Sequence, residues 1–182
     1  LNLIINLFNT AFLKYKLYIL LKCIIQNRMH TIEKKIKEMG LDIPNIPDPI
    51  ANYVPYKVYN KIITISGQAP IKNGKIIYKG KVGKDITIEE GIQASKLCAE
   101  NILAIIKKAC NNDWNNFGEL IKLGGFVNCA KDFSDHPKII NGASDMLVEV
   151  LGSSGKHTRF AVGANSLPLD ISVEIEALAS LR

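Results

Sequence analysis

The C-terminal residues 157–181 constrain the fold more strongly than any other part of this sequence. Two strand-like runs, 157–163 and 173–177, flank a loop that contains a proline, and the second run alternates apolar and polar side chains. Such alternation is typical of strands that bury one face. Arg159 lies in the first run and Glu174 in the second. If the two runs pair, both charges lie on one sheet.

An arginine and a glutamate on one sheet suggest a site for small carboxylic acids. A guanidinium group matches the two oxygens of a carboxylate with a fixed fork of donors. A glutamate beside it can accept a proton or orient a water molecule. Glu174 and Glu176 share one face of their run, because strand side chains alternate. From the residues alone, a solvated outer face and a loose surface ion pair are the simpler interpretations.

The other periodic segments predict an α+β domain in which two helices pack on one face of a mixed sheet. The expected elements are strands at 53–59 and 62–66, a helix at 88–110, a strand at 120–128, a helix at 137–151, and strands at 156–164 and 172–181.

Turn and cap residues place several of these boundaries. Residues 60–61 and the Asn-Gly pair at 73–74 predict tight turns, since asparagine and glycine tolerate positive φ. Thr87 and Glu90 form a capping-box sequence at the start of the first long helix. The two glycines at 124–125 lie inside a predicted strand, which indicates a bulge or a close backbone approach.

The first 28 residues differ in composition from the rest. They are rich in Leu, Ile and Asn, and their longest apolar run, 17–21, falls well short of the roughly 20 residues of a membrane span. No cleavage site of a signal peptide is evident. We interpret 1–28 as an extension outside the fold and 29–182 as one domain, with a marginal membrane-surface anchor as the alternative. A short helix is expected at 33–39, and the proline-rich stretch 43–49 is expected to be extended or a loop.

The net charge of +6 belongs mostly to this extension, which holds four basic residues and no acidic one. The remaining residues carry 19 basic and 17 acidic side chains, a net charge of +2. We therefore expect no nucleic-acid partner, and no stable membrane insertion.

The four cysteines do not follow a metal-binding spacing, so no metal site is expected. Cys98 and Cys110 fall inside a predicted helix, where buried free thiols are the simpler interpretation. Free thiols suit a reducing compartment, and the expected location is cytoplasmic.

Several short motifs occur along the chain from about residue 32 to residue 182. The most specific combination is Ser66-Gly67-Gln68, Arg159, Leu167-Pro168 and Glu174-x-Glu176, and further motifs are Tyr53-Val54-Pro55, Gly91-Ile92-Gln93-Ala94 and Phe126-Val127-Asn128. Together these motifs resemble the Rid family of reactive intermediate deaminases, also called YjgF or endoribonuclease L-PSP proteins. The run Asn141-Gly142-Ala143-Ser144-Asp145 and the pair His157-x-Arg159 are similar to a subgroup of longer members.

The resemblance implies the chorismate-mutase-like fold, a homotrimer, and sites in clefts between subunits. It implies hydrolysis of reactive 2-enamine or 2-imine carboxylic acids to 2-keto acids and ammonia, without a metal or cofactor. Arg159 falls at the position that binds the substrate carboxylate, and Glu174 at the position that orients the hydrolytic water. The resemblance does not assign that role to Glu176, which we interpret as structural or as a support for the residues that touch the substrate.

Five further residues are candidates for substrate binding: Tyr53, Ser66, Gly67, Asn141 and His157. The first four match positions along the family's cleft, although the tyrosine could instead serve packing and the asparagine could be a helix cap. The histidine lies two residues before Arg159 and therefore shares its strand face. It is either a second polar group of the site or a hydrogen-bonded structural residue.

Three departures from the family pattern affect the expected substrate. Ala161 stands where well-studied members carry a cysteine, Phe160 replaces a smaller residue, and the segment between 126 and 159 is longer than in standard members. These changes predict a different pocket size and substrate choice. A non-catalytic, carboxylate-binding or regulatory role is the alternative. A ribonuclease role is disfavoured, because the domain has no basic stripe and no pair of histidines suited to RNA cleavage.

Because the extension differs in composition from the domain, a chain of residues 29–182 should fold and assemble like the full chain. Thermal unfolding followed by circular dichroism, together with light scattering, measures both properties. Aggregation of the shorter chain, or loss of its oligomer, would show that residues 1–28 belong to the fold.

Overall fold

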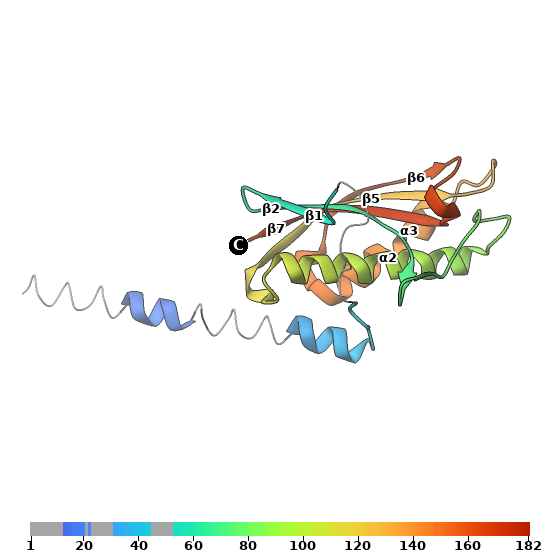
Figure 1. Ribbon diagram of the computed structural model, residues 1–182. Coiled ribbons are helices and arrows are strands. Elements are labelled where there is room, and N and C mark those ends of the chain that lie inside the picture. The colour runs from blue at the N-terminus through green and yellow to red at the C-terminus, as the bar shows by residue number, and fades with distance from the viewer. Residues whose placement is uncertain (1–12, 21, 23–30, 45–52) are drawn as a thin grey trace, which may run out of the picture.

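The computed structural model describes residues 13–20, 22, 31–44 and 53–182, and it shows a mixed sheet with two long helices on one face (Figure 1). The strands are β1 (Tyr56–Tyr59), β2 (Ile62–Gln68), β3 (Ile71–Lys72), β4 (Lys75–Ile76), β5 (Phe117–Asn128), β6 (Thr158–Ala164) and β7 (Val173–Leu181). The helices are α2 (Ile88–Ala109) and α3 (His136–Leu151), with three short 3-10 turns, η1 (Trp114–Asn116), η2 (Gly152–Gly155) and η3 (Pro168–Asp170). The predicted fold class is confirmed.

The main sheet has the strand order β1-β2-β7-β5-β6, and only β5 and β6 are parallel. The idea that the two C-terminal runs pair with each other is therefore wrong, because β5 lies between them. The cause is the connection through α3. A helical crossover returns the chain parallel to the strand it left, so β6 takes the edge beside β5.

The turn signals are confirmed by backbone geometry. Residues Asn60 and Lys61 have φ of 47° and 65°, and the pair at 73–74 joins β3 to β4 with φ of 52° and 73°. The first strand is shorter than expected, so Tyr53 lies outside the sheet. The irregularities in the pairing of β5 lie between Phe117 and Lys122 rather than at the two glycines.

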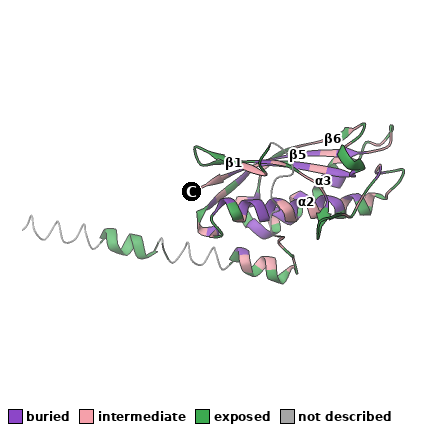
Figure 2. Cartoon of the chain, in the orientation of Figure 1, coloured by how far each residue is buried: buried purple, intermediate pink, exposed green. Residues whose placement is uncertain are grey.

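Helix α2 begins at the predicted capping box. The Glu90 amide donates to the Thr87 hydroxyl at 3.1 Å, and the Thr87 amide donates to the Glu90 carboxylate at 2.8 Å. The inner faces of α2 and α3 form the core with the sheet, as the buried residues in Figure 2 show. Helix α3 ends at Leu151, and the next residue, Gly152, caps it with a φ of 63°, in the left-handed region that glycine permits.

The glycine pair of β5 allows close approach on both faces of the central strand, by Phe160 of the neighbouring strand β6 on one face and by α3 on the other. A Cβ atom on Gly124 would lie 2.7 Å from the Phe160 ring, and one on Gly125 would lie 2.6 Å from Ile140 of α3. The close-approach interpretation is therefore confirmed. It brings α3, and the polar side chains on it, near β5 and the neighbouring edge strand β6.

Before the sheet, residues 31–38 form the expected short helix, and Gly40 follows it with φ of 63°. Ile32 is 2% exposed and joins the core, whereas residues 13–20 are helical and exposed. Residues 45–49 of the predicted loop and Met29, the expected start of the domain, lie outside the described residues. Within the described ranges, no helix has the length and apolar character that crossing a membrane requires.

Replacing Thr87 by Ala should lower the free energy of unfolding by about 1 kcal/mol, because the Glu90 amide loses its acceptor. Thr87→Ser is the matched control and should keep most of the stability, since it keeps the hydroxyl. Urea unfolding followed by circular dichroism measures the difference. Equal stability of the Ala and Ser variants would show that the cap contributes nothing.

Candidate functional site

Glu174 lies on the face of the sheet that the helices leave uncovered. Its neighbours in β7, Val173 and Ile175, are buried in the core, so the alternation turns the glutamate outward. Its carboxylate occupies the space beside Gly67 of β2, where a Cβ atom would lie 2.0 Å from Oε1. Glycine is therefore required at position 67 for this packing, which explains one of the predicted site residues.

Burial raises the pKa of the Glu174 carboxyl above its usual value. No described residue forms a hydrogen bond or ion pair with this carboxyl group. A half-buried carboxyl without a cationic partner has more tendency to hold a proton than a solvated one. Such a group is suited to exchange protons with a ligand or a water molecule.

Glu176 is on the same face but in a different environment. Its carboxylate lies 3.9 Å from the Lys122 amine, and that amine lies 5.2 Å from the centre of the Phe160 ring. The Phe160 ring packs edge-on against Phe126, with 5.3 Å between centroids. This environment agrees with the structural role expected for Glu176, since its charge is already paired on an exposed surface.

Ser66 holds the segment that leads into β1, and Tyr53 lies at the beginning of that segment. The Ser66 hydroxyl donates to the Val54 carbonyl at 2.8 Å, and its amide donates to the Pro55 carbonyl. The hydroxyl is thus used to hold the segment before β1, and it does not act as a free donor toward a cleft. Tyr53 is 62% exposed. Gln68 donates to the carbonyls of Ser66 and Gly67, so its side chain stabilises the local backbone at the end of β2.

Arg159 lies on the opposite face of the sheet, toward α3. Its Nη1 donates to the Ser144 hydroxyl at 2.9 Å, and its Nη2 to the Pro137 carbonyl at 3.4 Å. Both acceptors belong to α3. The next residue on the strand, Phe160, faces the other side, where it meets Gly124 and Lys122. Arg159 and Glu174 therefore share a sheet but not a face, which corrects the arrangement that a direct pairing of their runs would give.

His157 joins the same hydrogen-bonded group as Arg159. Its Nε2 lies 3.0 Å from the Ser144 hydroxyl, and its Nδ1 lies 2.6 Å from the Gly155 carbonyl. Both side chains reach Ser144, so the expectation that they share a face is confirmed. Ser144 was not predicted from the sequence as a site residue. The sequence did offer one signal for it. Ser144 lies seven residues after Pro137, about two turns along the same face of the predicted helix, so both residues can contact one neighbouring side chain.

The remaining candidate, Asn141, is exposed on α3 and has no cap role, because the helix begins five residues earlier. It lines a cavity of about 330 Å³ with Lys96 and Lys138, between α2 and α3. The structure therefore places it on the outer side of the helix layer, and no contact joins it to Arg159.

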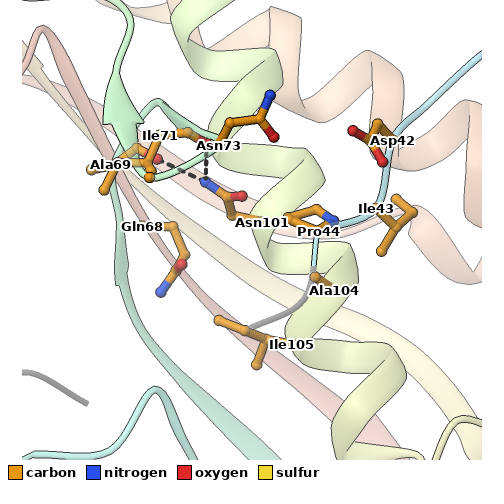
Figure 3. A pocket seen from close by; sticks show the side chains of 11 residues that line it. Asp42, Ile43, Pro44, Gln68, Ala69, Ile71, Asn73, Asn101, Ala104 and Ile105 are labelled. Carbon is orange, nitrogen blue, oxygen red and sulfur yellow. Dashed lines mark hydrogen bonds between the residues drawn. The ribbon is translucent and has the colours of Figure 1, made fainter. Parts of the chain in front are cut away.

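A larger cavity, of about 440 Å³, contains none of the candidate site residues. It lies between residues 42–44, α2 and the end of β2 (Figure 3), and Asp42, Gln68, Asn73, Asn101 and Ile105 line it. The Asn101 amide donates to the carbonyls of Ala69 and Ile71 at its edge. In the ranges that the structure describes, no group of three or more His, Cys, Asp or Glu side chains could hold a metal ion.

Comparisons with known proteins agree with the fold. The family model described as "YjgF/chorismate mutase-like, putative endoribonuclease" matches residues 33–181. The protein TCP17 of Trypanosoma cruzi is 31% identical over 152 residues, which cover 83% of this chain and 94% of that protein. The solved structure of Atu1372 from Agrobacterium tumefaciens, a protein of unknown function, is 40% identical with a TM-score of 0.80, and the match covers 88% of this chain and 99% of that one. The structure of TdcF from E. coli with bound serine is 25% identical with a TM-score of 0.56, over 77% and 96% of the two chains.

Proposed function

Since this chain belongs to the YjgF/chorismate mutase-like family, we propose that it hydrolyses reactive 2-enamine or 2-imine carboxylic acids to 2-keto acids and ammonia. The observation that carries the proposal is the environment of Glu174. Its carboxyl is half-buried, has a raised pKa and is unpaired among the described residues, whereas Glu176 two positions later is paired with Lys122. Only the first of these two glutamates is prepared to handle a proton.

In the proposed reaction, Arg159 binds the substrate carboxylate through its remaining N–H donors. An enamine substrate first takes a proton from solvent at carbon and becomes the iminium ion, the protonated imine. Glu174 orients a water molecule and accepts one of its protons while the water oxygen adds to the iminium carbon. The resulting carbinolamine takes that proton from Glu174 onto its nitrogen and loses the nitrogen as ammonia, and its hydroxyl group releases a proton to solvent as the C–O bond becomes the carbonyl of the 2-keto acid.

The two charged residues can act on one substrate only if they come from two copies of the chain. In a single chain they lie on opposite faces of the sheet. We therefore place the site between subunits of a homotrimer, with Glu174 from one subunit and Arg159 from the next. Apolar side chains on the uncovered sheet face support such an assembly: Ile62, Phe126, Phe160, Val162 and Leu178.

The substrate class agrees with what a relative binds. The TdcF structure contains bound serine, a small molecule with a carboxylate and a nitrogen on the next carbon. A 2-imino acid has the same arrangement of these groups.

For this chain, we propose a cytoplasmic location, because its described cysteines, Cys98, Cys110 and Cys129, are free thiols.

Glu174→Gln should lower kcat by about 10²–10⁴-fold, because the amide keeps the shape of the side chain but cannot accept a proton. Glu176→Gln is the matched control on the same strand face and should change kcat little. The assay generates 2-aminoacrylate or a related imine in situ and follows the release of the 2-keto acid.

Two outcomes would contradict the proposed function. If the two glutamine variants behave alike, Glu174 has no special role. If the wild-type protein binds small 2-keto acids but never hydrolyses an imine, the non-catalytic, carboxylate-binding role replaces the deaminase.

A further inference from the structure

The orientation of Arg159 is maintained by a chain of hydrogen bonds. Arginine on an exposed edge strand has many rotamers, and its freedom must be lost before two N–H groups can meet a carboxylate together. Here the guanidinium group contacts Ser144, Ser144 contacts His157, and His157 contacts the Gly155 carbonyl. We call these three links the Ser144–His157 relay.

The chemistry of the partners gives each link a direction. A carbonyl oxygen can only accept, so Nδ1 of His157 carries the proton and donates to Gly155. In the neutral imidazole, Nε2 is then an acceptor, and the Ser144 hydroxyl donates to it. The lone pairs of the same hydroxyl are directed away from the histidine and accept from Nη1 of Arg159. Each bond polarises the next, because all donate in one direction.

The far end of the relay is held rigidly. Gly155 is buried, and a Cβ atom there would lie 2.6 Å from the Leu147 carbonyl of α3 and 2.9 Å from Val148. The backbone of Gly155, in η2, thus packs closely against the same helix that provides Ser144. His157 therefore bridges Gly155 of η2 and Ser144 of α3, and its ring defines where the serine hydroxyl points.

The relay leaves the guanidinium group able to bind a ligand. Of its five N–H donors, one on Nη1 is used by Ser144 and one on Nη2 by the Pro137 carbonyl. Three donors therefore remain. The two acceptors belong to residues seven positions apart on α3, so the group is held between two points of that helix.

We propose that Ser144 and His157 are positioning residues that hold the Arg159 guanidinium group in the orientation in which it receives the substrate carboxylate. This inference rests on the proposed function for the role of the carboxylate. The relay itself is a property of the described residues and can be tested separately.

Ser144→Ala should raise the Kd for 2-oxobutyrate roughly 10-fold in calorimetric titration, because the guanidinium group loses an acceptor and part of its order. The KM for an imine should rise in parallel while kcat changes little, since the relay orients a binding group and does not touch the reacting carbon. Ser144→Thr keeps the hydroxyl and should restore the wild-type Kd.

Two substitutions of His157 separate the ends of the relay. His157→Gln can place an amide oxygen near the position of Nε2, so it should keep Kd near the wild-type value. His157→Asn keeps a donor near the position of Nδ1 but does not reach Ser144, so it should behave like Ser144→Ala. Nitrogen NMR of the wild-type protein, at a pH where imidazole is neutral, should show the His157 proton on Nδ1.

The outcomes distinguish this inference from the proposed function. If Ser144→Ala binds 2-oxobutyrate as tightly as the wild type, or if the His157 proton resides on Nε2, the relay does not position Arg159. If the wild type neither binds nor hydrolyses these acids, the proposed function fails. The NMR signal of the Arg159 Nε–H then tests whether the relay orders the arginine side chain. A signal that broadens in Ser144→Ala and recovers in Ser144→Thr supports the relay, and a signal that is unchanged in both variants overturns it.

Discussion

The pairing of β5 with both β6 and β7 determines where the charged side chains of the site can lie. Through this central strand, Arg159 is in register with Leu123 and Glu174 with Phe126, three residues further along β5. An odd separation on one strand places side chains on opposite faces. One face carries α3 and the guanidinium group, and the other carries the half-buried carboxyl. A single chain therefore holds two incomplete halves of the proposed site.

Each half is prepared by its own neighbours. On the uncovered face, the missing side chain of Gly67 makes room for the Glu174 carboxyl, and burial raises the pKa of that group. On the helix face, Ser144 and the Pro137 carbonyl hold the guanidinium group, and His157 orients the serine. In both cases the charged residue lies on a strand, and the residues that prepare it come from another element. Fixed strand backbones suit groups that must meet with little rearrangement.

Local chemistry made much of the fold predictable from the sequence. The capping box at Thr87, the Asn-Gly turn at 73–74 and the cap of α3 at Gly152 all depend on residues a few positions apart, and all are confirmed. The strand order was not predictable in this way, because it depends on the α3 crossover that inserts β5 between β6 and β7. For the same reason the opposite faces of Arg159 and Glu174, and the contact of Ser144 with both Arg159 and His157, required the structure.

The most direct test of this account is a mixing experiment with two inactive variants. Chains that carry Arg159→Ala and chains that carry Glu174→Gln are unfolded, mixed in equal amounts and refolded together. If each site takes its glutamate from one subunit and its arginine from the next, about one quarter of the sites in random trimers are intact, and activity should recover to about that fraction of the wild type. Imine hydrolysis that never exceeds that of the separate variants would contradict a site shared between subunits.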